Sequence, residues 1–401
     1  MINKFDWNIS KILDILIFFG LFIFAITGIF SISAMDIGAG LALIFLIIYK
    51  INNKDFQIKN SYHDKFIIVF LIILFISYLY GLMYGNDPGS YLFRYIRPFI
   101  IYYIVIDYSP SLNKVKILFF SLNLSFLITI IYNLINEDTF RHHRYLETFN
   151  THIMEYGTIL AFLLIASLLY LLWVNIKIRY KLILLINSSL ALITLINSRR
   201  RGVWLSLIFA LLVLFAIKGK KYFVGFLIFI IIFTMVSPYI LEESTINRFI
   251  SIFELDNHRT RLNLYKGSLE ILRDNLFLGT GLDSFESVIN EYLPEDHRGS
   301  TVHAHNEILQ FGVVAGLPGI IAFILLYFNL LKRQINNYFI SEIKNYKYLY
   351  LTTFLIIVIY LFHGITEVMI NHRFLNYLLW FIIALTEIVK KHELSLKGEN
   401  N

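Results

Sequence analysis

Residues 222–240 read YFVGFLIFIIIFTMVSPYI and contain no charged side chain. A helix of about 20 such residues is long enough to cross the hydrocarbon core of a bilayer. Similar apolar runs recur from residue 12 to residue 389, in a chain of 401 residues that is 57% hydrophobic and 16% charged. Soluble domains average roughly 45–50% apolar and about 25% charged residues. The sequence therefore excludes a soluble fold and predicts an all-α, polytopic transmembrane protein.

Polar breaks divide the apolar runs into about twelve predicted spans. These cover residues 12–32, 35–49, 66–83, 91–107, 117–135, 154–174, 182–197, 203–217, 222–240, 308–331, 348–365 and 374–389. The prediction has four parts along the chain. They are spans one to nine within 1–240, one large loop with an amphipathic helix over 241–307, spans ten to twelve within 308–389, and a tail over 390–401.

Lysine and arginine lie on opposite sides of the predicted membrane. The side with both termini holds 21 of the 35 basic residues, of which 19 are lysine, and the positive-inside rule makes it cytoplasmic. The other side holds 14 basic residues, of which 13 are arginine. Orientation requires only positive charge, whereas the planar guanidinium fork suits bidentate contacts with phosphate. The excess of arginine on the outward side favours a site there for a phosphorylated ligand. The alternative is that these arginines form surface ion pairs on exported loops.

Several classes of function are excluded or disfavoured by what the sequence lacks. Cysteine is absent, so disulfides, thiolate metal sites and cysteine nucleophiles are excluded. No GxxxxGK[ST] loop supports ATP-driven transport, and no DxD pair supports a metal-dependent sugar-nucleotide transferase. The net charge of +7 is attributed to the positive-inside bias rather than to nucleic-acid binding. The first apolar run lacks a small-residue cleavage site, so no cleavable signal peptide is expected.

The first arginine cluster lies at an outward break between two spans. Residues 197–205 read NSRRRGVWL, and three consecutive guanidinium groups (Arg199, Arg200 and Arg201) need water or an anion there. Gly202 would allow a tight turn into the next helix, whose first N–H groups would add to an anion site. The alternative is three arginines that extend to the membrane interface without a ligand.

The second arginine cluster lies in the large loop, where residues 257–265 read NHRTRLNLY. A helix is expected from about Thr260 to Arg273, because Leu262, Tyr265, Leu269 and Leu272 fall on one helical stripe. It would lie on the membrane surface or over a cleft, with Arg261 and Arg259 near its N-terminal end, where an anion is favoured. An ordinary amphipathic helix with solvated arginines is the alternative.

The third cluster, HAHNEILQFG at residues 303–312, lies where the large loop re-enters the membrane. A neutral imidazole can take a hydroxyl proton near physiological pH, which makes His305 and His303 candidate bases. Two histidines in His-x-His can also form a metal pair on a strand. The segment is expected to run into a helix, where positions i and i+2 do not share a face, so no metal is predicted. Interfacial histidines without a chemical role are a further alternative.

These motifs resemble the O-antigen ligase and polymerase superfamily. Arg201-Gly202-Val203-Trp204-Leu205 fits its Arg-x3-Leu element. His305-Asn306, nine residues and then Gly316-Leu317-Pro318-Gly319 fit the ligase pattern His-Asn-x9-Gly-x-x-Gly. The order of the motifs, the predicted spans and the single large loop extend the resemblance over nearly the whole chain.

The resemblance implies an inverting, metal-independent glycosyltransferase without a cofactor. Such an enzyme moves a glycan from undecaprenyl pyrophosphate to a sugar of lipid A–core, on the periplasmic face of the inner membrane. Carried over by position, Arg201 and Arg261 would bind the pyrophosphate, and His305 would orient or deprotonate the acceptor hydroxyl. Asn306 would position the acceptor, with weaker binding roles for His303 and for the remaining arginines, Arg199, Arg200 and Arg259.

Two rival functions remain open from the sequence. An O-antigen polymerase would use the same donor but would extend another lipid-linked chain. A non-enzymatic carrier or flippase of lipid-linked sugars would place its charges along a midplane path on several spans. The charges of this chain gather instead at the outward ends of the predicted spans, which favours an enzyme. Its partners would be membrane lipids, the lipid-linked donor and the acceptor, and no nucleic acid.

Overall fold

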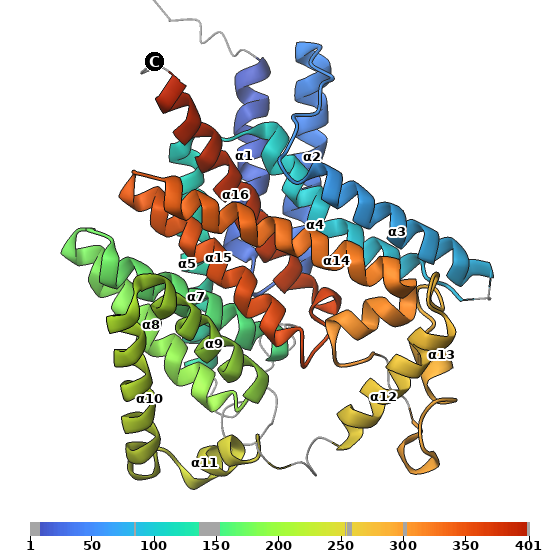
Figure 1. Cartoon of the computed structure of the whole chain (residues 1–401). Helices are drawn as coiled ribbons and strands as arrows, with labels where there is room; N and C mark the ends of the chain where they lie inside the picture. Colours follow the sequence, from blue (N-terminus) through green and yellow to red (C-terminus); the bar gives the residue numbers. More distant parts are fainter. Residues whose placement is uncertain are drawn as a thin grey trace, which may run out of the picture. The chain divides into compact units, whose positions relative to one another are not determined.

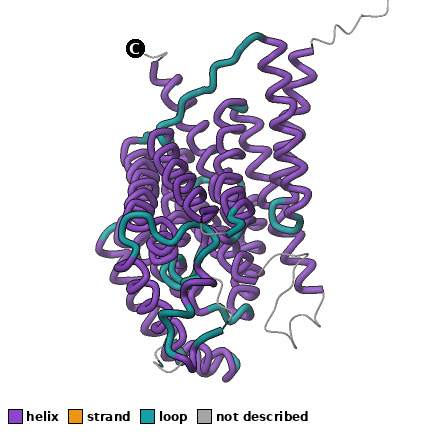
Figure 2. Tube along the Cα trace, turned by 90° about the vertical axis from the view of Figure 1, so that its right-hand side faces the viewer, coloured by secondary structure: helices purple, strands orange, loops and turns teal. Residues whose placement is uncertain are grey.

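The computed structural model describes residues 9–83, 86–135, 153–252, 254, 259–299 and 303–398. Within these residues all regular secondary structure is helical (Figures 1 and 2). A helix coincides with every predicted span: α1 Ile9–Thr27, α2 Ile32–Asn53, α3 Asp64–Met83, α4 Gly89–Tyr108, α5 Leu112–Ile135, α7 Ile153–Trp173, α8 Ile178–Asn197, α9 Arg201–Lys218, α10 Lys220–Ile240, α14 Glu307–Ile340, α15 Lys344–His363 and α16 Arg373–Gly398.

Ten helices of the described chain are long and apolar enough to cross a membrane. The two predicted spans outside this group are α4 and α16, so the count of twelve stays a prediction. In lipid every backbone N–H and C=O must be satisfied within the segment, which is why each long apolar run folds as a helix. The chain is therefore a multi-pass helical membrane protein.

The described residues fall into two compact units. One lies within Met1–Tyr62, Arg97–Tyr156 and Arg373–Asn401, and the other within His63–Ile96 and Gly157–His372. In the first unit α1 packs closely on α2, because Gly20 and Gly38 leave no side chain between the backbones. A Cβ at Gly20 would lie 2.6 Å from the backbone nitrogen of Ala42. Small residues at such contacts are the usual means of packing helices in membranes.

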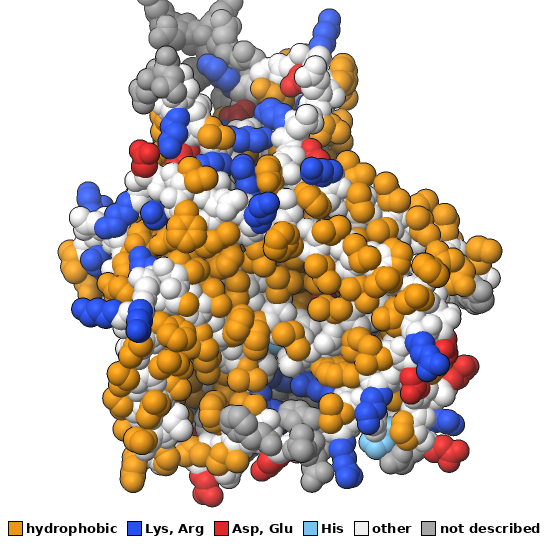
Figure 3. All heavy atoms as spheres, viewed as in Figure 1, with side chains coloured by type: hydrophobic (Ala, Val, Ile, Leu, Met, Phe, Trp, Pro, Cys, Tyr) orange, Lys and Arg blue, Asp and Glu red, His pale blue; other side chains and the backbone are white. Residues whose placement is uncertain are grey.

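The second unit contains all three of the motifs found in the sequence. In it α14 packs against α3 and α15, and α15 packs against α9, which also contacts α10. No described residue of α10 is buried, and Figure 3 shows hydrophobic side chains over much of this helix. An apolar helix with no buried residue is stable in lipid rather than in water.

A break divides α14 into two parts at Gly316. Gly316 has φ 64° and ψ −161°, so the residues before it, from Glu307, form a short helix of their own. Backbone atoms of the preceding loop satisfy the groups that the break leaves open. The bonds run from Thr280 N to Val313 O at 2.7 Å, from Gly281 N to Val314 O at 3.1 Å and from Leu317 N to Leu276 O at 2.8 Å. The loop thereby fixes the direction of the short helix that follows the histidines.

Replacing Gly279 by alanine is expected to destabilise the protein, because Gly279 has φ 65° and meets the break directly. A Cβ there would lie 2.4 Å from Val313 O and 2.6 Å from Ala315 N. We expect a clearly lower unfolding temperature in detergent, corresponding to roughly 1–3 kcal/mol for a strained backbone position. Gly225→Ala on α10 is the control, since no atom lies within 4 Å of the added carbon. Equal unfolding temperatures for the two variants would contradict the packing of the loop into the break.

Between α10 and α14 the described residues form three α-helices, α11 Glu243–Ile250, α12 Arg259–Asp274 and α13 Phe285–Ile289, and the 3-10 helix η2 Glu295–His297. The bounds of α12 agree with the predicted helix 260–273, but the predicted apolar stripe does not form its buried face. Leu262 and Leu269 are exposed, whereas Leu264 and Ile271 are buried. They join a small core with residues of α13, the loop after it and α14. The face with Leu264 and Ile271 is the buried one because it contacts apolar side chains of α13 and α14. Helical periodicity alone does not reveal this contact.

Candidate active site

The histidine motif lies in a tight loop that ends at the start of α14. His305 has φ 50°, a left-handed backbone conformation that is uncommon outside glycine and that clusters at functional sites. Asn306 is the N-cap of α14, with its side-chain oxygen accepting from Leu309 N at 3.0 Å. Its amide nitrogen donates to Ile365 O at 3.1 Å. Asn306, predicted to bind substrate, thus has a structural function at both ends of its amide.

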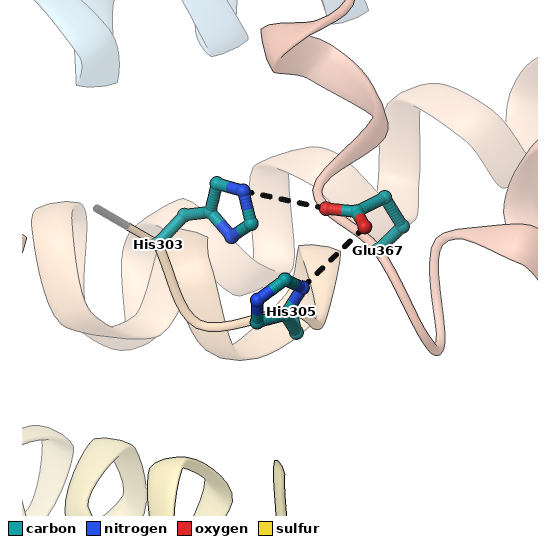
Figure 4. A group of neighbouring side chains, drawn as sticks. All are labelled: His303, His305 and Glu367. Atoms are coloured by element: carbon teal, nitrogen blue, oxygen red, sulfur yellow. Dashed lines mark ion pairs between the residues drawn. The ribbon is translucent and has the colours of Figure 1, made fainter. Parts of the chain in front are cut away.

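The turn at His305 brings both imidazoles to one carboxylate, Glu367, in the connection between α15 and α16 (Figure 4). His303 Nε2 lies 3.4 Å from Glu367 Oε1, and His305 Nδ1 lies 3.4 Å from Glu367 Oε2. The carboxylate side chain is only 5% exposed, whereas that of His305 is 31% exposed. Glu367 therefore faces the rings from inside, and His305 remains accessible to a ligand.

The positions of the two histidines correct the reasoning that disfavoured a metal pair. His303 and His305 were expected to run into a helix and to point to different faces. The helix begins only at Glu307, and the ring centroids lie 4.3 Å apart. The loop before the helix, not the helix itself, determines their direction. The expectation that the two imidazoles point in different directions was therefore wrong. Their proximity does not by itself show that they bind a metal.

Burial and charge give the groups of this cluster different protonation states. Burial alone would raise the pKa of the Glu367 carboxyl, but the hydrogen bond from His305 and the neighbouring imidazoles hold it well below its usual range. Burial lowers the pKa of His303 to about 4, an effect that the nearby Glu367 opposes only in part. At neutral pH Glu367 is therefore a carboxylate and His303 a neutral base.

Glu307, two residues after His305, bonds to the connection between α15 and α16. Its buried carboxyl group accepts from Ile370 N at 3.2 Å, and its own backbone N–H donates to Gly364 O at 2.7 Å. These bonds hold the start of α14 against the connection that carries Glu367. Glu307 thus positions the loop, while Glu367 meets the rings.

Tyr265 links α12 to the histidine loop and to the connection that carries Glu367. Its hydroxyl lies 3.0 Å from His305 O and 3.0 Å from Ile365 O, so it donates to the histidine loop or to the Glu367 connection. Arg261 lies one helical turn before Tyr265 on α12. The charges of Arg261 and Glu367 both act on the Tyr265 hydroxyl. The second arginine cluster is therefore connected to the histidines through a single side chain.

Gly202 brings the first arginine cluster to the same place. A Cβ on Gly202 would lie 2.8 Å from Thr366 Oγ1 and 2.9 Å from His363 Cδ2. Glycine is needed here for the close approach of α9 to α15, rather than for the turn that the sequence predicted. Arg201, the residue before it, is therefore held beside the connection that carries Glu367.

The three consecutive arginines separate in the structure. Arg199 points to α11, where it bonds Ser244 Oγ at 2.9 Å and pairs with Glu242 at 3.6 Å, with nearly half of its side chain exposed. Arg200 acts electrostatically on His363. Arg201 donates to Ser251 O at 2.6 Å and to Ser251 Oγ at 3.1 Å.

Arg201 lies within electrostatic range of two further arginines, Arg248 of α11 and Arg261 of α12. Arg259, at the start of α12, is exposed. In the view of Figure 3, Lys and Arg side chains lie inside a recess in the lower part of the picture. Like charges brought together at a partly buried site repel each other unless an anion accompanies them. The structure thus unites Arg201 and Arg261 and leaves Arg199 outside the group.

Residues 186–324 match the O-antigen ligase family. The matched segment includes the arginine pair, all of the large loop and the histidine motif. Over these residues the chain is similar to the O-antigen ligase family. A search among curated proteins gives no match to the chain.

Beside the residues that carry the similarity to the O-antigen ligase family, sequence reasoning missed three side chains of the cluster. Glu367 and His363 lie near the end of α15, beyond the matched segment, and Arg248 lies on α11. A signal for Glu367 was present, because a carboxylate next to a predicted span end is costly unless it has a partner. The connection from 366 to 373 is short, and its pairing with a residue about 60 positions earlier cannot be seen in one sequence.

Replacing Glu367 by glutamine is expected to slow the reaction and to move its pH dependence. The pKa of Glu367 in the folded protein is lower than its value of about 4.3 in the unfolded chain, so the side chain is a carboxylate at every pH above 4.3. Any change in rate between pH 5 and 8 therefore comes from the titration of other groups. Glutamine no longer stabilises positive charge on the rings. We therefore expect the acid limb of the rate profile to move to lower pH, with a rate at least about tenfold lower.

The measurement is the rate of glycan transfer as a function of pH with purified protein. Exposed Glu291, on the loop after α13, provides the matched Glu→Gln control. If the acid limb of Glu367→Gln is unchanged, the carboxylate does not affect the pKa of the base whose protonation stops the reaction.

Proposed function

We propose that this protein is an O-antigen ligase, which transfers a glycan from undecaprenyl pyrophosphate to a sugar hydroxyl of lipid A–core. The site would face the periplasm at the inner membrane, with both termini in the cytoplasm, and the protein would act in lipopolysaccharide biosynthesis. The observation that carries the proposal is the convergence of Arg201 and Arg261 with the cluster of His305 and Glu367. Similarity to the O-antigen ligase family supports a lipid-linked glycan as the donor.

The arginines would act on the leaving group. When the bond between the anomeric carbon and the pyrophosphate oxygen breaks, negative charge grows on that oxygen. Guanidinium groups aimed at this position stabilise the charge more in the transition state than in the ground state. Arg201 and Arg261 suit this role because they approach from two different elements and both lie within electrostatic range of each other. Arg200 and Arg248 add positive charge nearby.

His305 would act on the acceptor. Its Nδ1 faces Glu367, which favours the tautomer with the proton on Nδ1 and a free electron pair on Nε2. Nε2 would take the proton of the acceptor hydroxyl as its oxygen attacks the anomeric carbon. The bond to pyrophosphate breaks in the same displacement, so the anomeric configuration inverts. Glu367 would stabilise the imidazolium that forms, as a carboxylate behind a catalytic histidine does.

The reaction needs neither a metal nor a cofactor in this scheme. Pyrophosphate is a good leaving group, and the chain supplies both the positive charge and the base. His303, neutral at pH 7 (pKa about 4) and partly exposed, would bind the acceptor sugar by a hydrogen bond. Arg259 would contact the donor at the rim of the site.

A deletion strain tests the proposal, with the lipopolysaccharide analysed on a gel. Loss of a ligase should leave bare lipid A–core while lipid-linked polymer accumulates in the membrane. Loss of a polymerase, the second candidate that the family similarity supports, should leave core with a single repeat unit. Loss of a carrier should leave lipid-linked glycan on the cytoplasmic side. Unchanged core and glycan would overturn the proposal.

A further inference from the structure

We propose that His303, His305 and Glu367 form a binding site for one zinc ion, and that zinc bound there inhibits the protein. Each residue offers one ligand atom, and these atoms all lie within 4.8 Å of one another. Imidazole nitrogens and a carboxylate oxygen are ligands that zinc prefers, whereas magnesium prefers oxygen alone. The inhibitory part of the proposal rests on the proposed function; the binding part does not.

The spacing of the ligand atoms fits a tetrahedral ion. Two ligands at 2.0–2.1 Å from tetrahedral zinc are about 3.3 Å apart. His303 Nε2 lies 3.4 Å from Glu367 Oε1 and His305 Nδ1 lies 3.4 Å from the other oxygen, Oε2, so each nitrogen is near that separation from one oxygen and one ring must turn toward the oxygen that binds the ion. The separation between the two imidazoles can shorten by rotation of the His305 ring, which is 31% exposed. Three protein ligands leave a fourth position for water, as in open zinc sites.

The access and the local structure also suit an ion. The Nδ1 atom of His305 is buried and faces Glu367 Oε2 at 3.4 Å, so an ion bound there would take the place of the proton between the two groups. Glu367 is held in place by the bond from Val368 N to its Oε1 at 3.1 Å. A carboxylate held this way keeps its direction while the rings adjust. An ion can enter from the side on which His305 is exposed.

Zinc at this place would stop the transfer for a chemical reason. A cation bound to Nδ1 of His305 uses the electron pair of that atom, so the remaining ring proton must lie on Nε2. Nε2 then has no free electron pair and cannot take the proton of the acceptor hydroxyl. The ion also lies between Nδ1 and Glu367, so the carboxylate can no longer stabilise a positive charge on the ring. Bound zinc and proton transfer by His305 therefore exclude each other.

Zinc binding is measured first, on detergent-purified full-length protein without a polyhistidine tag, after treatment with a chelator. Titration against a colorimetric zinc indicator should give one zinc per chain, and magnesium should not compete. His303→Asn and Glu367→Gln should each weaken binding by more than about 10–100-fold, the effect of losing only an outer-shell partner. His297→Asn is the matched control, since His297 lies on the same loop but outside the cluster.

Zinc binding that is absent, or that is equal in His303→Asn, Glu367→Gln and the unchanged protein, would overturn the site. The two substitutions remove different ligands, so their agreement separates loss of a ligand from misfolding. An unfolding temperature for each variant, measured without zinc, completes this control.

Inhibition is measured on glycan transfer, with each protein compared with its own zinc-free rate. The unchanged protein and His297→Asn should lose transfer in zinc and recover it with EDTA, whereas His303→Asn should resist zinc. If zinc binds at one per chain and transfer continues, the inhibitory role is wrong. If EDTA stops transfer and zinc restores it, inhibition is wrong and so is the metal-independent reaction. If no transfer occurs under any condition, the proposed function fails while the binding data still decide the site.

Discussion

His305→Gln is expected to lower the rate of glycan transfer by roughly 10²–10⁴-fold, the usual contribution of a positioned general base. Glutamine has a similar length and can form hydrogen bonds, but it cannot take a proton at neutral pH. The affinity for the lipid-linked donor should change little, because the arginines that would hold the pyrophosphate are intact. The rate at saturating donor and the donor concentration at half that rate separate the two effects.

His297→Gln is the matched control for this prediction, because it makes the same change on the same loop away from Glu367. The His305 variant should accumulate in the membrane like the control. Transfer at the normal rate in His305→Gln would remove this residue from the mechanism.

Arg261→Ala is expected to lower the rate of transfer by about 10²–10³-fold, as for the loss of one preorganised charge from a developing anion. Arg261→Lys should recover only part of this loss, because ammonium retains the charge but not the planar fork. Donor affinity should fall in both variants, unlike in His305→Gln. The measurement is the rate of transfer over a range of donor concentrations.

Arg273→Ala provides the control on the same helix, since Arg273 is exposed in the last turn of α12. Arg201→Ala should resemble Arg261→Ala, but it also removes the contacts with Ser251. Ser251→Ala removes only the contact with Ser251 Oγ and should retain most of the activity. Full activity in Arg261→Ala would exclude it from the pyrophosphate site.

The positions of the long helices were predictable because lipid permits few alternatives. A run such as residues 222–240 can satisfy its backbone in a bilayer only as a helix, and α10 occupies Lys220–Ile240. The similarity to the O-antigen ligase family was predictable for a different reason: its motifs are contiguous in sequence. The bounds of α12 followed from local periodicity in the same way.

The direction of side chains was less predictable, because it depends on contacts between distant segments. The stripe of α12 that includes Leu262 is exposed, and the buried face is determined by α13 and α14. The convergence of His303 and His305 depends on a left-handed backbone at His305, which no motif indicates. Their partner, Glu367, lies in a connection of only a few residues. The separation of Arg199 from Arg201 likewise depends on α11.

The break in α14 has a consequence for the order of assembly during membrane insertion. The carbonyls of Val313 and Val314 accept from Thr280 and Gly281, which precede α14 in the chain. Each such group left open in lipid costs several kcal/mol. These two carbonyls are therefore satisfied only once the loop has folded against α14, while Glu367 follows α15 in the chain. A ribosome-bound chain that ends within α15 would hold both histidines without their carboxylate, so the site is completed among the last steps of biogenesis.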